Sequence, residues 1–375
     1  MSPKPSLGTT DLALPPWLAA AWHALQKMRG AGRLPHALLI VGPAGVGKRR
    51  LVERLAGSLL CPSLGPDAEP CGRCQDCRLL GAGTHPDLVR VGPDPQGKSD
   101  EIRVASIRDL IESEGLTPTR GARKVICIDP AERMNPSAAN ALLKTLEEPS
   151  PGTLFCLVTE RAHLLPATVR SRCQRLPLGL PDEAQALDWL AGRVGVGDPR
   201  LLLRLAHGAP LRALALADAA WLARRDAAFA AFLAIGQGRS DPVAEAQGWS
   251  DLVPRVSLEW LGGWVSDLLR LAADPGVGYV SHPDKRGALA ELAARLDAPA
   301  AHRYLQRVLR ARASQDSTLN PQMLHEGLLI GWAELAAGLG SQPGDTPGGR
   351  SSGPSGRRPG RPGQPSEMSW ASATQ

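Results

Sequence analysis

The sequence predicts an α/β protein whose first half is built on a parallel sheet and whose second half is helical. Up to residue 159, apolar runs typical of strands alternate with helical patterns; the runs are HALLIV (36–41), DLVRV (87–91), KVICID (124–129) and TLFCLVT (153–159). Strands that alternate with helices form a parallel sheet with helices on both faces. Beyond about residue 180 the strand signals stop and helical patterns follow one another.

The composition is that of a globular protein with two or three domains. The chain has 375 residues, of which 43% are hydrophobic and 21% charged, and its net charge is +6. That charge is compatible with nucleic acid nearby but does not require it. We expect a cytoplasmic protein, because no apolar run approaches a membrane span and the start has no signal-peptide pattern. Seven cysteines, four of them clustered, favour reduced thiols over disulfides.

Helices are expected between the strands of the first half, at about 16–28, 48–60 and 104–113. The next helix has the clearest punctuation, since Asn135 can cap its start, Pro136 suits its first turn and Pro149 follows its end. Its apolar residues recur at helical spacing and give it one buried face: Ala139, Leu142, Leu143 and Leu146.

The second half is expected to form two helical blocks, at about 181–240 and 250–338. In the first block, Asp198-Pro199 begins a short helix that Gly208 ends, and Pro210 begins another. The Trp and Leu stripes of the second block are interpreted as core. Two tails are expected to be disordered, the polar segment 1–14 and the Gly/Pro/Arg-rich segment 340–375, because neither can bury enough apolar surface to fold.

The stretch GPAGVGKRR (42–50) follows the first strand and opens a helix, as a phosphate-binding loop does. Gly42, Gly45 and Gly47 can bring backbone N–H groups close to phosphate oxygens at the positive end of that helix. Lys48 supplies a cation for the outer phosphates. The alternative is a glycine-rich turn without a ligand, but the preceding strand and the register of Lys48 favour a nucleotide site.

The residues for hydrolysis are altered at two positions. Arg49 stands where the loop pattern has the Ser or Thr that holds Mg²⁺. KVICID supplies an acid, Asp129, but Pro130 follows where a glutamate is usual, and Glu132 lies two places too far along without a rearranged backbone. We therefore expect a site able to hold ATP or ADP but unable to hydrolyse it.

Four cysteines have the spacing of a metal site. Cys61 is followed by CGRCQDC, which gives Cys-x9-Cys-x2-Cys-x2-Cys with Cys71, Cys74 and Cys77. Four thiolates complete a tetrahedral zinc shell with no open position, so the predicted zinc is structural and fixes a loop inserted at 61–77. The alternative, a set of unrelated thiols, does not explain the spacing. The other cysteines are expected to be core residues: Cys127, Cys156 and Cys173.

The third candidate is Ser171-Arg172-Cys173, which follows the last strand and a short helical turn. An arginine at the edge of a subunit can reach a neighbour's γ-phosphate and stabilise its transition state. A surface arginine that neutralises a helix end is the alternative, and with Arg170 and Arg175 close by the position alone leaves both open.

Taken in order, these segments resemble the bacterial DNA polymerase III clamp-loader subunits, which are AAA+ proteins. The matching segments are LPHALLIVGPAGVGK, the four-cysteine insert, HPDL (85–88), AERMNPSAANALLKTLEEPSPGTLFCLVT and LLPATVRSRCQ. The resemblance is specific over about 16–180 and weaker in WVSDLL and LNPQMLHEGLL. It implies a nucleotide-binding domain at 15–180, a helical lid at 181–245 and a helical collar domain at 246–339.

Within this family the chain resembles the δ′ type of subunit, because Arg49 and Pro130 depart from the γ and τ motor subunits. The resemblance implies a stator that lends Arg172 in trans to a motor subunit's ATP site and does not hydrolyse ATP. The implied partners are the γ/τ and δ subunits and, through the complex, the sliding clamp and primer–template DNA. The family's sensor positions fall near Thr159 and Leu211, so Arg212 is one residue out of register.

Two other functions stay open at this point. One is an active γ/τ-like ATPase with unconventional metal ligation. The other is a zinc-containing nucleic-acid binder with a vestigial loop, although the sequence CGRCQDCR brings only two arginines and one acid.

Overall fold

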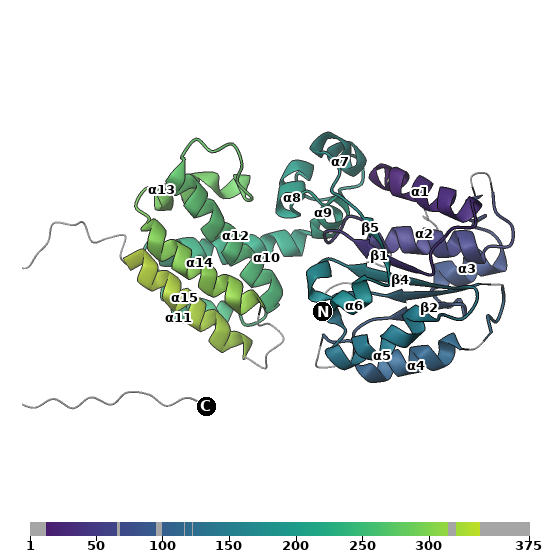
Figure 1. Ribbon diagram of the computed structural model, residues 1–375. Coiled ribbons are helices and arrows are strands. Elements are labelled where there is room, and N and C mark those ends of the chain that lie inside the picture. The colour runs from purple at the N-terminus through teal and green to yellow at the C-terminus, as the bar shows by residue number, and fades with distance from the viewer. Residues whose placement is uncertain are drawn as a thin grey trace, which may run out of the picture. The chain divides into compact units, whose positions relative to one another are not determined.

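The computed structural model describes residues 13–65, 68–94, 100–115, 117–121, 123–313 and 320–337, all within one compact unit, Met1–Leu339. The predicted tails, 1–14 and 340–375, lie outside these residues except for Ala13 and Leu14. The described residues confirm the predicted fold class, a parallel sheet with helices on both faces followed by helices alone (Figure 1).

The sheet has five strands in the order β2-β3-β4-β1-β5, and all are parallel. The strands are β1 (Ala37–Val41), β2 (Leu88–Val91), β3 (Lys124–Ile128), β4 (Thr153–Thr159) and β5 (Gln174–Pro177). The sequence predicts the first four. The edge strand β5 was missed, because its exposed Gln174 and Arg175 and its Pro177 conceal the apolar pattern.

Side chains alternate between the two faces of the sheet, so each face has its own core. Leu38 and Ile40 of β1 point to the cluster covered by α1 (Ala19–Gly30), α2 (Lys48–Leu60) and α3 (Gln75–Ala82). Ala37 and Leu39 point to the cluster covered by α4 (Val104–Glu114) and α5 (Pro136–Glu147). A short helix, α6 (Ala167–Arg170), leads from β4 to β5.

The start of α5 is capped as predicted. Asn135 Oδ1 accepts a hydrogen bond from the backbone N–H of Ala138 at 2.8 Å, and Pro136 occupies the first turn. Its inward face is buried at Ala139, Leu142 and Leu146. Sequence and structure agree closely here because the cap and the apolar spacing specify the same helix.

The helices after residue 180 form two further cores. The first contains α7 (Glu183–Leu190), α8 (Pro199–Leu205) and α9 (Pro210–Leu216). The second contains α10 (Ala219–Gly236), α11 (Pro242–Gly248), α12 (Pro254–Ala273), α13 (Arg286–Ala293), α14 (Ala298–Ala313) and α15 (Pro321–Ala337). Its centre is aromatic: Phe232 stacks on Trp332 with ring centroids 4.2 Å apart, and Trp264 is fully buried. None of the described helices is long and apolar enough to cross a bilayer.

The packing of α10 bears on the predicted boundary at 245/246. Phe229 and Phe232 of α10 are buried in the core of α12 and α15, and not among the helices α7 to α9. We therefore propose that the third domain begins at α10, close to residue 219.

Candidate functional site

The phosphate loop lines a cavity at the carboxyl end of the sheet. Val41 of β1 lies in register with Thr159 of β4, so the segments after both strands meet at one edge. The cavity has a volume of about 500 Å³ and is lined by the loop, the segment after β3, the end of β4, and residues of α9 and α12. The predicted residues Gly45, Gly47, Lys48 and Asp129 all line it, whereas Gly42 packs against Leu178.

The loop has a left-handed backbone at two of its glycines. Gly45 and Gly47 have φ angles of +75° and +107°, which favour glycine, and Gly47 caps α2. Within the part of the chain that the structure describes, the first-turn N–H groups of residues 48–50 have no hydrogen-bond acceptor. Lys48 is buried, and its Nζ donates to the carbonyl oxygens of Gly42 and Pro43 at 2.7 Å each. Burial lowers the pKa of Lys48, although Glu160 Oε1 lies 3.9 Å from Nζ.

Arg49 and Asp129, singled out separately in the sequence, form an ion pair. Arg49 Nε donates to Asp129 Oδ2, which links the first turn of α2 to the end of β3. Burial alone would lower the pKa of Arg49, but the Asp129 carboxylate raises it. A phosphate-loop enzyme holds its metal with a hydroxyl at position 49 and the acid at position 129. In this chain the Arg49 guanidinium joins these two positions.

The helices after the sheet contact the loop directly. The backbone N–H of Leu211, at the start of α9, donates to Gly45 O at 3.1 Å. Trp17 Nε1 donates to Val46 O at 2.8 Å, and the Trp17 ring packs edge-on against Trp189 of α7. Leu211 lines the cavity, whereas Arg212 forms an ion pair with Glu259 of α12. The sensor role that the resemblance implies near Leu211 stays a prediction.

Several cavity residues were not identified as site residues from the sequence. Glu160 lines the cavity, while the neighbouring Thr159 is fully buried with its hydroxyl accepting from the N–H of Arg161 at 3.1 Å. Glu132 also reaches the cavity wall, and its Oε1 accepts from the N–H of Glu160 at 3.1 Å. No local pattern marked Arg255, which comes from α12, more than 200 positions after the loop.

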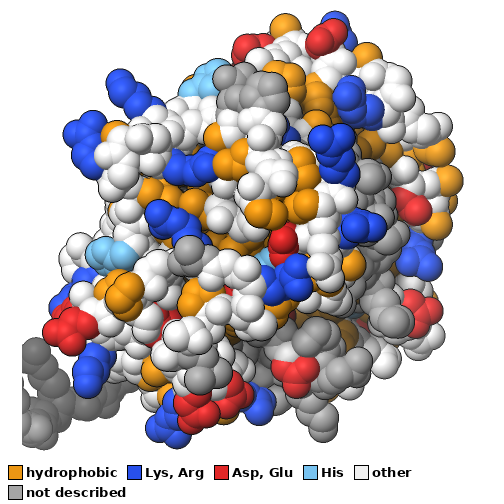
Figure 2. All heavy atoms as spheres, turned by 90° about the vertical axis from the view of Figure 1, so that its right-hand side faces the viewer, with side chains coloured by type: hydrophobic (Ala, Val, Ile, Leu, Met, Phe, Trp, Pro, Cys, Tyr) orange, Lys and Arg blue, Asp and Glu red, His pale blue; other side chains and the backbone are white. Residues whose placement is uncertain are grey.

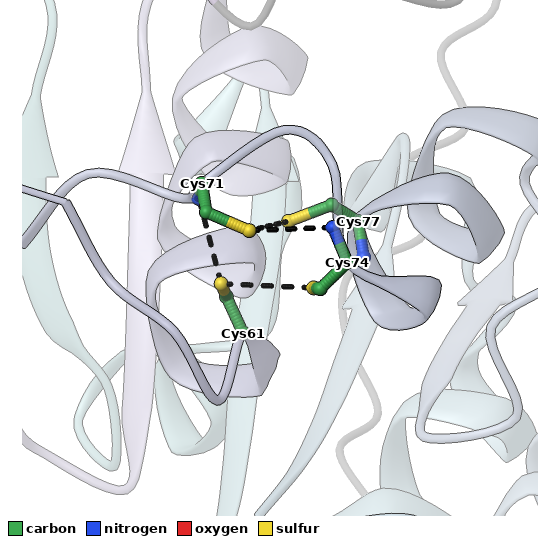
Figure 3. Close-up of side chains that lie close together, drawn as sticks. All are labelled: Cys61, Cys71, Cys74 and Cys77. Carbon is green, nitrogen blue, oxygen red and sulfur yellow. Dashed lines mark hydrogen bonds between the residues drawn. The ribbon is translucent and has the colours of Figure 1, made fainter.

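The four predicted cysteine ligands converge. Their sulfur atoms all lie within 4.8 Å of one another, with Cys61 Sγ 3.8 Å from Cys74 Sγ and Cys71 Sγ 3.9 Å from Cys77 Sγ (Figure 3). Four thiolates about 2.3 Å from a tetrahedral zinc ion are separated by roughly 3.8 Å. The donor set and its geometry therefore fit structural zinc.

Backbone amides support the sulfur atoms as they do in metal sites. The N–H groups of Cys74 and Cys77 donate to Cys71 Sγ and Cys74 Sγ, at 3.3 Å each. Hydrogen bonds from the backbone of Arg73 and Cys74 lower the pKa of Cys71 to about 6, whereas burial raises the pKa of Cys61. Of the cysteines predicted as core, Cys127 and Cys156 are buried and Cys173 is half-buried.

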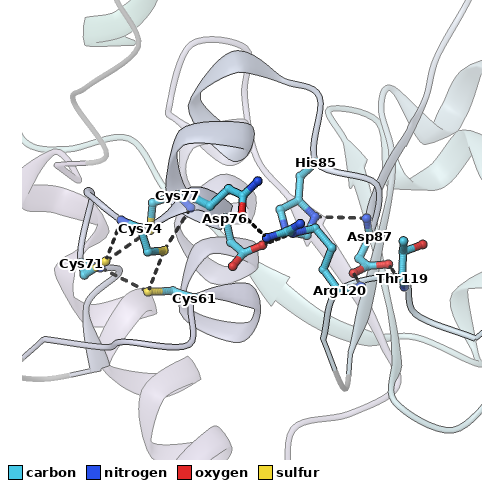
Figure 4. A network of polar contacts seen from close by, with 10 residues as sticks. Cys61, Cys71, Cys74, Asp76, Cys77, His85, Asp87, Thr119 and Arg120 are labelled. Carbon is cyan, nitrogen blue, oxygen red and sulfur yellow. Dashed lines mark hydrogen bonds and ion pairs between the residues drawn. The ribbon is translucent and has the colours of Figure 1, made fainter.

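A polar network joins the zinc module, the segment 61–77 that carries the four cysteines, to the segment between α4 and β3 (Figure 4). Asp76 of α3 contacts His85 Nε2 at 3.3 Å and accepts from Arg120 Nε at 2.5 Å. Asp87, fully buried, accepts from the N–H groups of Thr119 and Arg120 at 2.6 and 2.9 Å. His85 and Asp87 of the HPDL segment thus have a structural role, which the sequence pattern did not indicate.

Arg172 lies on the surface after α6 and is held there by neighbours. Its Nε donates to Glu147 Oε1 of α5 at 2.7 Å, Nη2 contacts the same carboxylate, and Nη1 donates to Thr168 O at 2.8 Å. The sequence placed α5 near this surface but did not predict the pairing with Glu147. The Arg172 side chain is not fully buried, and it does not line the cavity beside the phosphate loop.

Comparison with known proteins gives the family. Family models described as "DNA polymerase III, delta subunit" and "DNA polymerase III, delta subunit, C terminal" match residues 17–181 and 219–334. DNA polymerase III subunit delta' of Pseudomonas aeruginosa is 35% identical over 329 residues, which cover 85% of this chain and 97% of that protein. The Escherichia coli subunit delta' is 35% identical over 321 residues, covering 84% and 94%.

A relative of another subunit type matches a smaller part of the chain. Escherichia coli DNA polymerase III subunit tau is 36% identical over 204 residues, which cover 52% of this chain and 31% of tau. The delta' relatives, by contrast, align over 84–85% of this chain. The chain therefore belongs to the family of DNA polymerase III delta' subunits.

Proposed function

We propose that this delta' chain is a non-hydrolysing stator of the clamp loader, which lends Arg172 to the ATP site of an adjoining γ/τ motor subunit. The observation that supports this most strongly is the ion pair between Arg49 and Asp129. It occupies the metal position of the chain's own site, while Arg172 stays on the surface. The proposed partners are the γ/τ and δ subunits and, through them, the sliding clamp and primer–template DNA.

The surface position of Arg172 is what a guanidinium acting in trans requires. It lies just after α6, and the partners of its guanidinium among the described residues are all exposed: Glu147, Thr168 and Ser171. A phosphate oxygen from another subunit can replace the carboxylate without unfolding any part of this chain. Arginine fingers of this kind raise kcat at the neighbouring site by about 10³-fold or more.

The test is reconstitution of the complex with motor and δ subunits, followed by ATPase assays with and without primed DNA. The native chain alone is expected to show no ATPase. In the complex, Arg172→Ala should abolish turnover at the adjoining motor site while assembly, measured by size-exclusion chromatography, is unchanged. Arg170→Ala, an exposed arginine two places away, is the matched control. Loss of assembly with Arg172→Ala would show a structural role instead.

One observation favours the alternative of an active ATPase. Glu132 lines the cavity, although from the sequence it lies two places too far along to replace the usual glutamate. Its Oε1 is held by the N–H of Glu160, however, and Asp129 is engaged by Arg49. Steady-state hydrolysis by the isolated chain, lost in Lys48→Ala, would establish this alternative.

A zinc-dependent nucleic-acid binder is less well supported. On the face shown in Figure 2, Lys and Arg side chains are spread among apolar and uncharged ones and form no continuous basic surface. We propose that the four cysteines hold zinc in a structural role. DNA binding by the isolated chain that is lost in Cys71→Ser would favour the nucleic-acid binder.

A further inference from the structure

The cavity beside the phosphate loop is rich in cations beyond those expected of such a loop. Among the residues that the structure describes, six Lys and Arg side chains and three Asp and Glu side chains line it. The cations come from the loop and α2, from the segments after β3 and β4, and from α12. A concave site with an excess of positive charge attracts anions and holds them more tightly than an exposed patch would.

Two groups in the cavity are suited to phosphate oxygens in particular. The first-turn amides of α2, residues 48–50, have no hydrogen-bond acceptor among the described residues and lie at the positive end of a 13-residue helix. The Lys48 side chain, 7% exposed, lines the cavity, and its Nζ lies 2.7 Å from each of two loop carbonyl oxygens. An incoming phosphate chain would find donors already in place.

Arg49 determines whether a divalent cation can bind together with the phosphate. A divalent cation in such a site needs an oxygen ligand at position 49 and the carboxylate after β3. The guanidinium has five N–H donors and no lone pair for a metal, and its Nε is paired with Asp129. The Arg49 side chain is 71% exposed, so its terminal nitrogens can still donate to a ligand, whereas Asp129 is 14% exposed.

We propose that this cavity binds the phosphate chain of a nucleotide or of inorganic polyphosphate without a divalent cation, with the Arg49 guanidinium supplying the charge at the metal position. The proposal deepens the proposed function, because a site of this kind retains a ligand that it cannot cleave. It does not depend on Arg172, so either proposal can fail without the other.

The test measures binding to the full-length chain by calorimetry, with ATP, ADP and tripolyphosphate as probes. For the native chain, Mg²⁺ in place of EDTA should change the dissociation constant by less than about threefold. Arg49→Thr should weaken binding in EDTA by about tenfold or more, since a charge-assisted hydrogen bond is lost, and should make binding Mg²⁺-dependent. Arg224→Thr is the matched control: it removes the same charge at an exposed position of α10 that does not line the cavity, and should leave binding and its independence of Mg²⁺ unchanged. Thermal unfolding verifies that both variants fold.

A second readout follows the metal itself. Electron paramagnetic resonance with Mn²⁺ and ATP should show no protein-bound Mn²⁺ in the native chain and a bound signal in Arg49→Thr. Equal affinity for ATP and tripolyphosphate would identify the phosphate chain as the ligand, and tighter binding of ATP would add a nucleoside contact; both support the proposal. Bound Mn²⁺ in the native chain, or no binding of any probe at about 1 mM, would overturn it.

Discussion

At the scale of single residues, the neighbours Leu211 and Arg212 of α9 make different contacts. Leu211 lines the cavity, whereas Arg212 turns to Glu259 of α12, which also lies 3.4 Å from His207 Nε2. Burial alone would raise the pKa of Glu259, but His207 and Arg212 lower it to about 2. The Arg212 guanidinium therefore stabilises the contact between α9 and α12, while the backbone and Cβ of Arg212 lie against Gly45 of the phosphate loop.

The pair predicts how stability depends on pH. Because the folded-state pKa of Glu259 lies below its ordinary value of 4.5, its contribution is present above about pH 4.5 and is lost as the pH falls toward 2. Glu259→Gln should lower the free energy of unfolding at pH 7 by about 1.5–3 kcal/mol, and the difference should narrow at pH 3.5. Urea unfolding at both pH values measures this, with Glu334→Gln on the exposed face of α15 as control. A difference that does not change with pH would contradict the assignment.

At the scale of elements, α5 connects the core of the sheet to the proposed finger. Its start is set by the Asn135 cap, its middle is buried against the sheet, and its last residue, Glu147, holds Arg172. The position of Arg172 thus depends on a helix whose boundaries the sequence specifies at both ends.

Removal of the cap tests this element. Asn135→Ala leaves the N–H of Ala138 without its acceptor and should destabilise the chain by about 1 kcal/mol. Asn135→Asp should retain most of the stability, because a carboxylate can accept the same hydrogen bond. Ser137→Ala, exposed in the first turn, should change little. Chemical denaturation of the four proteins gives the comparison, and a full-size loss in Asn135→Asp would count against the cap.

At the scale of the whole molecule, the zinc module is connected to distant parts of the chain. Cys61 ends α2 and Cys74 caps α3, so both helices meet at the metal position. From there the network of Asp76 and Arg120 reaches the segment before β3. Zinc held by the four cysteines would therefore help to position elements that are far apart in the sequence.

Zinc removal should therefore affect more than the insert. Chelation under reducing conditions should lower the melting temperature by about 5 °C or more and increase amide exchange at 117–121 as well as at 61–77. Cys74→Ser should reproduce the loss, and Cys173→Ser should keep a full equivalent of zinc by elemental analysis. Unchanged amide exchange at 117–121 would show that the segment bound by Asp76 and Asp87 does not depend on zinc.

The sequence predicts features that local patterns encode. Four strands, the bounds of α2, the cap of α5 and the four cysteines were all found, since each rests on spacing or on a capping residue. The edge strand β5 and the helix α3 were missed, because exposed polar residues and cysteines replace the usual apolar pattern. The pairings of Arg49 with Asp129 and Arg172 with Glu147 join residues 80 and 25 positions apart, and no local pattern specifies such contacts.

The contacts of Arg172 also bear on the thermodynamics of assembly. Glu147 and Thr168 already restrict the rotamers of the arginine before any other subunit arrives. Fixing a free side chain at an interface costs about 0.5–1.5 kcal/mol of conformational entropy, and much of that cost is met during folding of this chain. On assembly, the phosphate of the adjoining subunit's ATP would replace the Glu147 carboxylate beside a guanidinium that is already held in place. The loss of side-chain entropy would then be smaller than for a flexible arginine.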